Sequence, residues 1–133
     1  MELTIFRCAM LATWYWITTW RCFYPVYWQA AQPLFTGIIV GIVMGEMKAG
    51  IVIGAVIQPM FLAFTGGGGT VPWDATAGTI AGGAVTMAAD LPLEQALVIA
   101  VPVSLLCAQL HTIRRIVLAY PAERADAAAL EGN

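Results

Sequence analysis

Polar groups that could hold a hydroxylated ligand gather between Gln58 and Asp74 of this 133-residue chain. Gln58 lies inside an apolar run, and four glycines at 66–69 lead to Thr70 and Asp74. Backbone N–H groups, an amide, a hydroxyl and a carboxylate can all hydrogen-bond hydroxyl groups. The ring of Trp73 can pack against the C–H face of a sugar. The chemistry therefore suits an uncharged, polyhydroxylated ligand such as a sugar.

The same residue types argue against catalysis. The chain has a single histidine, no nucleophile–base arrangement, and three cysteines without metal-ligand spacing. The glycine run lacks the following Lys and Ser/Thr that complete a phosphate-binding loop. We therefore predict a binding site with no catalytic residue, no metal and no cofactor.

Asp74 has a second, structural interpretation. An aspartate that precedes a helix can cap it by accepting N–H bonds from the first turn, here from Thr76 or Ala77. Capping does not exclude ligand contact, so both roles stay open for this carboxylate.

The composition indicates what must position these groups. The chain is 60% hydrophobic and 11% charged, whereas globular chains carry about 45–50% apolar and about 25% charged residues. Charged residues lie mostly at the ends of apolar runs, which favours an all-α, multi-spanning helical membrane protein with short, broken or re-entrant helices. The alternative is a soluble all-α domain with buried helices. A net charge of −2 without a basic patch argues against nucleic acid as a partner.

Residues 1–32 form an aromatic-rich first unit. The 13-residue run between Arg7 and Arg21 is too short to cross a membrane alone, because a crossing needs about 20 residues. Trp and Tyr gather where membrane meets water, so we expect an interfacial or re-entrant helix that ends near Pro25. One tilted transmembrane helix is the alternative.

Residues 33–120 form the predicted membrane core. Pro33 is favourable at the start of a helix. Gly37, Gly41 and Gly45 then recur at every fourth residue, and Gly50 and Gly54 repeat the spacing. This pattern predicts glycine grooves at which helix backbones pack closely.

The later part of the core has one predicted interruption and one long span. Gln58-Pro59 predicts a disrupted helix. A close-packed helix should run over 75–89 and be ended by Asp90, with Pro92 starting a span that reaches about Tyr120. Residues 121–133 read as a polar helical tail, or as a linker to a second half.

Two arginines and a histidine lie near the end of that span. Arg114 and Arg115 predict that this end faces the cytoplasm. His111, close to them, is interpreted as a residue of the membrane surface rather than part of a proton relay.

The stretch QPLFTGIIVGIVMGEMKAGIVIGAVIQPMFLAF, followed by GGGGTVPWD, resembles the IIC component of mannose/sorbose-family phosphotransferase systems. The residues that carry the resemblance are Gln32-Pro33-Leu34, Gly37, Gly41, Gly45-Glu46, Gly50, Gly54, Gln58, Gly68-Gly69 and Pro72 to Asp74. Pro59 and Trp73 depart from the usual pattern of that family.

The resemblance implies a sugar-translocating permease subunit in a bacterial inner membrane. It implies a IID-type membrane partner, cytoplasmic IIA and IIB components that phosphorylate the sugar, and a homo- or hetero-oligomer. This chain would correspond to one half of an inverted-repeat transporter. By motif position, the implied sugar-binding residues are Gln58, Gly68, Gly69, Thr70 and Asp74. The alternative is a non-transporting structural or remnant membrane protein that packs with partner helices through its glycine grooves.

Overall fold

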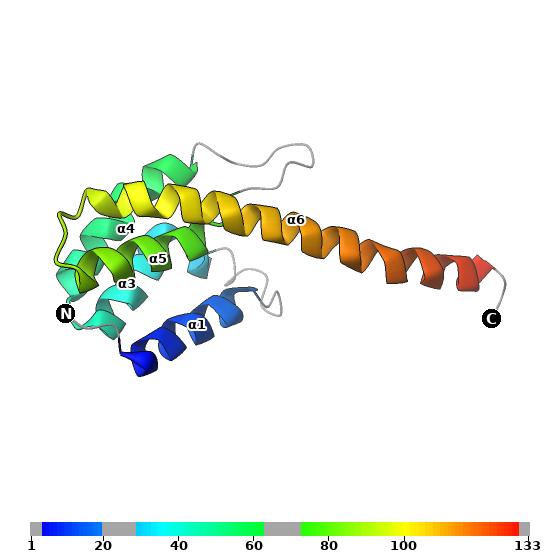
Figure 1. Cartoon of the computed structure of the whole chain (residues 1–133), viewed down its shortest axis with the longest axis horizontal. Helices are drawn as coiled ribbons and strands as arrows, with labels where there is room; N and C mark the ends of the chain where they lie inside the picture. The colour runs from blue at the N-terminus through cyan, green and yellow to red at the C-terminus, as the bar shows by residue number, and fades with distance from the viewer. Residues whose placement is uncertain (1–3, 20–28, 63–72, 131–133) are drawn as a thin grey trace.

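The computed structural model describes residues 4–19, 29–62 and 73–130. Within these ranges the regular structure is helical: α1 (Ile5–Thr19), α3 (Pro33–Met44), α4 (Met47–Leu62), α5 (Ala75–Ala88) and α6 (Gln95–Leu130). The all-α prediction is confirmed for the described residues. Figure 1 shows α1 along one side of a short helical body and α6 extending far beyond it. The predicted helix end at Pro25 lies outside the described residues.

α3 and α4 form an antiparallel hairpin in which the two backbones touch at glycine. A Cβ added at Gly37 would lie 2.8 Å from the Cα of Gly54, and one at Gly50 would lie 2.6 Å from the Cα of Gly41. Real Cβ atoms do not approach backbone so closely. Pro33 begins α3 as predicted, and the packing role of these four glycines is confirmed.

Gly45 has a different role from the other four glycines. It adopts a left-handed conformation with φ of 88°, and a Cβ there would meet nothing within 4 Å. Its N–H donates to the Gly41 carbonyl at 2.9 Å, and the Glu46 N–H donates to the same carbonyl at 2.8 Å. This is a helix C-cap, at which glycine is preferred because it has no Cβ to strain. The predicted packing role of Gly45 is wrong.

α5 and α6 form a second hairpin of the same kind. A Cβ at Gly78 would lie 2.7 Å from the Ala100 carbonyl oxygen, and one at Gly82 would lie 3.0 Å from the Ala100 Cβ. α5 is thus as closely packed as its composition predicts. It ends at Ala88, near the predicted end, and Asp90 turns the chain with φ of 50°.

The predicted disruption at Gln58-Pro59 is wrong. α4 continues through Pro59 to Leu62. The proline ring removes one N–H from the helix ladder. Only three helical residues follow it, so little of the helix depends on the lost bond.

α6 differs from the predicted span at both ends. It begins at Gln95 rather than at Pro92, because Pro92 to Glu94 form a turn in which the Gln95 N–H donates to the Pro92 carbonyl at 2.9 Å. It then runs for 36 residues through Pro102 and Pro121. The helix is therefore continuous from the predicted span into the predicted polar tail.

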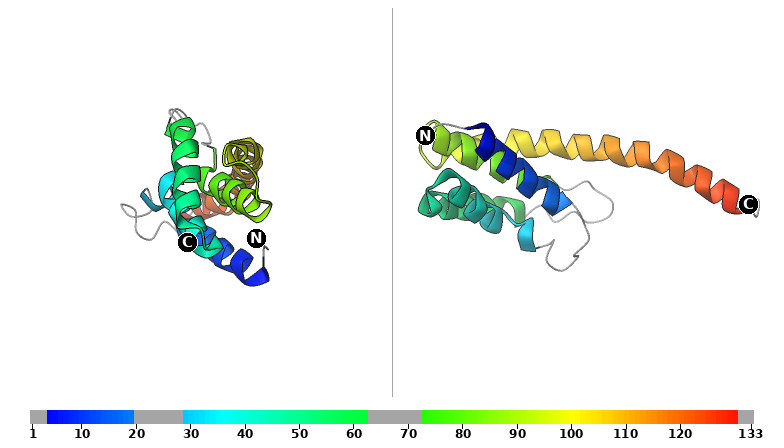
Figure 2. Two further views of the ribbon diagram at one scale, coloured as in Figure 1. Left: turned by 90° about the vertical axis from the view of Figure 1, so that its left-hand side faces the viewer. Right: turned by 90° about the horizontal axis from the view of Figure 1, so that it is seen from below.

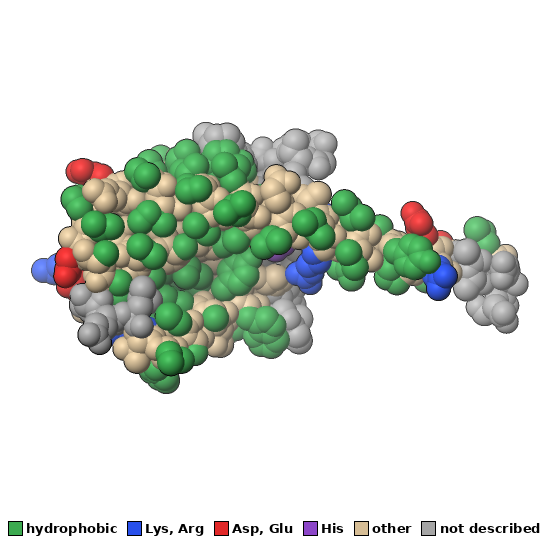
Figure 3. Space-filling model, viewed as in Figure 1, with side chains coloured by type: hydrophobic (Ala, Val, Ile, Leu, Met, Phe, Trp, Pro, Cys, Tyr) green, Lys and Arg blue, Asp and Glu red, His purple; other side chains and the backbone are tan. Residues whose placement is uncertain are grey.

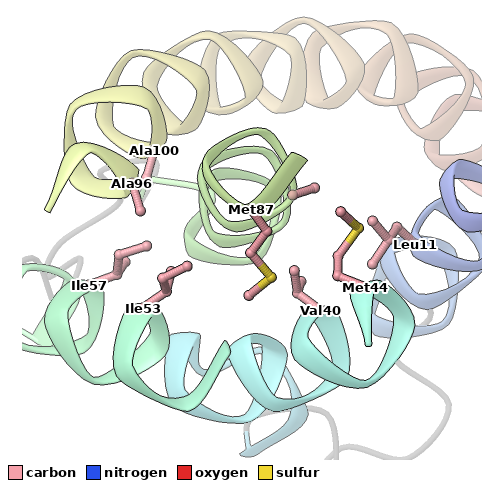
Figure 4. Packing of buried hydrophobic residues seen from close by; sticks show 9 residues of the cluster. Leu11, Val40, Met44, Ile53, Ile57, Met87, Ala96 and Ala100 are labelled. Atoms are coloured by element: carbon pink, nitrogen blue, oxygen red, sulfur yellow. The ribbon is translucent and has the colours of Figure 1, made fainter. Parts of the chain in front are cut away.

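The buried core lies where the two hairpins meet around α5. Val40, Met44, Ile53, Ile57 and Met87 are almost completely buried, and Figure 4 shows them converging between α5 and the α3–α4 pair. Figure 2 shows the α5–α6 pair on one side of the body, the α3–α4 pair on the other, and α1 along the edge. This arrangement leaves the outer faces of the helices uncovered.

Those outer faces are largely apolar. Figure 3 shows hydrophobic side chains spread over the body. Charged side chains lie at the end of the body opposite the tail, at the point where α6 leaves the body, and along the tail itself. Among the described helices, the segment Gln95–Asp126 is long and apolar enough to cross a membrane, while Pro33–Met44 and Met47–Leu62 are apolar but shorter. These features are compatible with a membrane location.

Gly50→Ala should destabilise the fold, because the new methyl group would overlap the backbone of Gly37 and Gly41. Overpacking of this kind costs about 1–3 kcal/mol, more than the roughly 1 kcal/mol that alanine gains over glycine in a helix. The measurement is thermal unfolding of the full chain in detergent, followed by circular dichroism.

Gly83→Ala is the matched control. Its nearest neighbour is the Val40 side chain, whose Cγ1 lies 3.1 Å from the added Cβ and can shift. The control should lose less stability than Gly50→Ala. Equal melting temperatures in the two variants would contradict backbone contact as the basis of the hairpin.

Candidate functional site

Asp74 lies at the N-terminus of α5, where it caps the helix. Its Oδ1 accepts a hydrogen bond from the Ala77 N–H at 2.9 Å, which confirms the predicted cap. The Asp74 N–H donates to the Ser104 carbonyl of α6 at 3.3 Å. The carboxylate is therefore fixed both to its own helix and to the neighbouring one.

The other carboxylate oxygen of Asp74 joins side chains from two more helices. The Tyr15 hydroxyl of α1 donates to Oδ2 at 2.6 Å, and Nε2 of His111 on α6 lies 2.9 Å from the same oxygen. A carboxylate can only accept, so both groups donate and His111 carries its proton on Nε2. The Tyr15 oxygen and His111 Nε2 lie 3.3 Å apart because both donate to the same oxygen, and neither donates to the other. We call Tyr15, Asp74 and His111 the carboxylate cluster.

Helical spacing explains why these donors reach Asp74. On α1, Leu11 and Thr18 are buried and Tyr15 lies between them, at the i, i+4, i+7 positions of one face. On α6, His111 follows the fully buried Ser104 by seven residues, or nearly two turns. The face of α6 that packs on α5 therefore also presents His111.

The cluster is largely removed from solvent. The side chain of Asp74 is 9% exposed and that of His111 is 33% exposed. Tyr15 lies on α1, outside the candidate membrane span of α6. Burial raises the pKa of its hydroxyl, and the hydrogen bond to Asp74 and the charge of that carboxylate raise it further. Its hydroxyl therefore keeps its proton and remains a donor.

Gln58, the other predicted binding residue that the structure describes, holds the start of α3. Its Oε1 accepts from the Leu34 N–H at 3.0 Å, one of the first-turn donors that a helix cannot satisfy by itself. Its Nε2 donates to Oε1 of Gln32 at 2.8 Å. The second N–H and the second lone pair of the amide take no bond from the described residues.

The segment 31–34 is hydrogen-bonded both by Gln58 and by the first turn of the helix that Asp74 caps. Gln58 reaches it from α4, and the Thr76 hydroxyl reaches it from the first turn of α5, donating to the Ala31 carbonyl at 3.1 Å. Nearby, the ring of Trp73 meets Phe61 edge to face, with 6.1 Å between centroids. Gln58 and the helix capped by Asp74 therefore meet the same short segment. Gly68, Gly69 and Thr70 lie outside the described residues.

Tyr15 and His111 are the residues that sequence reasoning missed. His111 was interpreted as a residue of the membrane surface, and Tyr15 as one of many interfacial aromatics. The signal that could have found His111 is the carboxylate itself. An acidic group within an apolar protein needs a partner, and the single histidine lies on the longest predicted span.

The cluster can accept hydrogen bonds from hydroxyl groups. Ionised carboxylates form hydrogen bonds of about 1.5–3 kcal/mol, stronger than neutral pairs. Within the described ranges, no three His, Cys, Asp or Glu side chains gather closely enough to hold a metal ion. The arrangement is that of a nearly buried carboxylate that accepts from Ala77, Tyr15 and His111.

The family described as "PTS system sorbose-specific IIC component" matches residues 5–133. The "PTS system mannose-specific EIIC component" of Escherichia coli K12 is 30% identical over 105 residues, covering 79% of this chain and 40% of that protein. The protein of the same name from Shigella flexneri matches with the same identity and coverage.

The chain spans 40% of the length of these curated relatives. No solved structure matches the chain significantly.

Asp74→Ala should lower the free energy of unfolding, because the cap of α5 and the acceptor for Tyr15 and His111 are lost together. Removal of a cap alone costs about 0.5–2 kcal/mol. Asp74→Asn keeps an oxygen that can cap the helix and should lose less. Chemical unfolding of the full chain in detergent measures both variants. Equal losses would show that the cap contributes nothing.

Proposed function

The chain belongs to the sorbose-specific IIC family of phosphotransferase systems, and from that premise we propose that it is a permease subunit that binds and translocates a sugar. The family match over residues 5–133 is the observation that carries the proposal. The relatives named for sorbose and mannose make hexoses the first substrates to test. The proposed location is the bacterial inner membrane, crossed more than once.

The membrane part of the proposal draws support from the surface of the helices. α6 exposes many large apolar side chains along its length, Val98 being 72% exposed and Ile116 67% exposed. In water such a surface would be unfavourable, whereas in lipid it is the expected exterior. The shorter α3 and α4, of 12 and 16 residues, are apolar as well, but each is shorter than the roughly 20 residues that a crossing needs.

The proposed sugar-binding residues are Gln58, Gly68, Gly69, Thr70 and Asp74. Asp74 supports the proposal because its carboxylate is ionisable and nearly buried in an apolar body, and groups of this kind mark substrate pathways in membrane proteins. Gln58 supports it because, among the described residues, its amide bonds only Leu34 and Gln32, which leaves one N–H and one lone pair. Two different hydroxyl groups of a sugar could use them.

The chain itself would carry out no phosphoryl transfer. We propose that cytoplasmic IIA and IIB components phosphorylate the incoming sugar and that a IID-type membrane subunit completes the permease.

The alternative, a non-transporting membrane protein that packs with partners through its glycine grooves, finds no better support. Gly37, Gly41, Gly50 and Gly54 face one another within the α3–α4 hairpin. A partner helix cannot use backbone surface that the chain's own helix already covers.

Gln58→Ala and Asp74→Ala should each reduce sugar uptake while the protein remains in the membrane. The loss of one hydrogen bond to a charged group corresponds to roughly a 10- to 100-fold weaker interaction. The measurement is uptake of radiolabelled mannose and sorbose by cells that express the full chain with its neighbouring phosphotransferase components. Membrane content is quantified by immunoblot.

Gln109→Ala is the matched control, since Gln109 is an exposed amide on α6, and it should transport normally. Normal uptake in both the Gln58 and the Asp74 variants would reject these binding residues. Absence of uptake of any sugar by the unaltered chain with its partners would reject the function.

A further inference from the structure

We propose that a ligand hydroxyl binds Asp74 by replacing the hydroxyl of Tyr15, while His111 stays in place as the permanent donor. The inference rests on the proposed function and assigns roles to two residues outside the predicted site. α1 is then a displaceable element that closes the binding carboxylate when no ligand is present.

Both oxygens of the Asp74 carboxylate already accept hydrogen bonds in this structure. Oδ1 holds the Ala77 N–H, and Oδ2 holds both Tyr15 and His111. With the Asp74 side chain 9% exposed, little of either oxygen remains open to a ligand. A hydroxyl that reaches Oδ2 must therefore take the place of a donor already there.

His111 is less free to move away from Asp74 than Tyr15 is. It lies on α6, whose backbone contacts α5 at Gly78 and Gly82. The Asp74 N–H also bonds the Ser104 carbonyl on the same face of α6. Separation of His111 from Asp74 would break this close packing.

Tyr15 lies on a helix that has few buried residues. Ile5 and Phe6 of α1 are 88% and 70% exposed, and only Leu11 and Thr18 of this helix are buried. α1 can move away from the body without opening either glycine hairpin.

The docked position of α1 also carries a free-energy cost. The indole N–H of Trp14 is buried and has no hydrogen-bond partner among the described residues. The ring itself stacks on Phe35, with 6.0 Å between centroids. Because a buried unsatisfied donor is unfavourable, movement of α1 into contact with water or headgroups recovers part of the cost of leaving.

The exchange conserves the hydrogen bonds of the carboxylate. A sugar O–H donates to Oδ2 in place of the Tyr15 O–H. Oδ2 of Asp74 therefore keeps two hydrogen-bond donors, and the charge of the carboxylate stays compensated. A hydroxyl matches the group it replaces in size and charge. A cationic ligand would instead meet the His111 N–H directed at the same oxygen.

The first test needs no sugar. A nitroxide spin label is attached to Cys8, an exposed cysteine of α1, in the full chain with Cys22 and Cys107 replaced by alanine and reconstituted in liposomes. Tyr15→Phe should increase the mobility of the label, because the hydroxyl that docks α1 is gone. Tyr120→Phe, on the exposed tail of α6, is the matched control and should leave the spectrum unchanged. Unchanged mobility in Tyr15→Phe overturns the proposal.

The second test is equilibrium binding of mannose and sorbose to the same full-length variants with their partner subunits. Tyr15→Phe should bind about fivefold tighter, since the ligand no longer competes with a hydroxyl, and His111→Ala should bind about tenfold weaker. Weaker binding by Tyr15→Phe would make Tyr15 a ligand-holding residue and overturn the exchange.

The two tests separate the inference from the function on which it rests. Binding of neither sugar by any variant rejects the proposed function and, with it, the exchange step. A more mobile label in Tyr15→Phe would then still establish the Tyr15–Asp74 bond as the contact that docks α1.

Discussion

Helix backbones touch at glycine in both hairpins, and the positions of the polar side chains depend on that contact. Gly54 lies against the Pro33 carbonyl and Leu34, and Gln58, one turn further along the same face of α4, thereby comes beside the Leu34 N–H. In the second hairpin, the approach of Gly78 to Ala100 and Ser104 brings α6 close enough for His111 to reach Asp74. A side chain at either glycine would separate the helices and both polar contacts with them.

A nearly buried carboxylate imposes the next constraint. Its charge is unfavourable away from water unless hydrogen bonds compensate it. Asp74 obtains donors from three places: its own helix through Ala77, the packed partner α6 through His111, and α1 through Tyr15. The last of these joins α1 to a body with which it shares little other buried surface. The N-terminal helix is thus held in part by a polar contact and not by apolar packing alone.

The sequence predicted what depends on local pattern. The close packing of Gly37, Gly41, Gly50 and Gly54, the helix start at Pro33 and the capping role of Asp74 were each predicted from local pattern, and the structure agrees. Gly45 was misassigned because periodicity alone cannot separate the last packing glycine from a cap. Gln58-Pro59 was expected to disrupt the helix, but α4 continues for three residues beyond Pro59. The carboxylate cluster could not be derived in this way, because its residues lie 59 and 37 positions apart and meet only through the packing of α1, α5 and α6.

The short segment 31–34 relates the two hairpins to each other. Gln58 of α4 fixes it through Leu34 and Gln32, and Thr76 of α5 fixes it through Ala31. Of the described residues proposed to bind sugar, Gln58 lies within the first hairpin, beside this segment, and Asp74 lies at the start of the second. Each hairpin is held by backbone contact at glycine, whereas the two hairpins meet through the apolar core around α5 and through the hydrogen bond from Thr76 to Ala31.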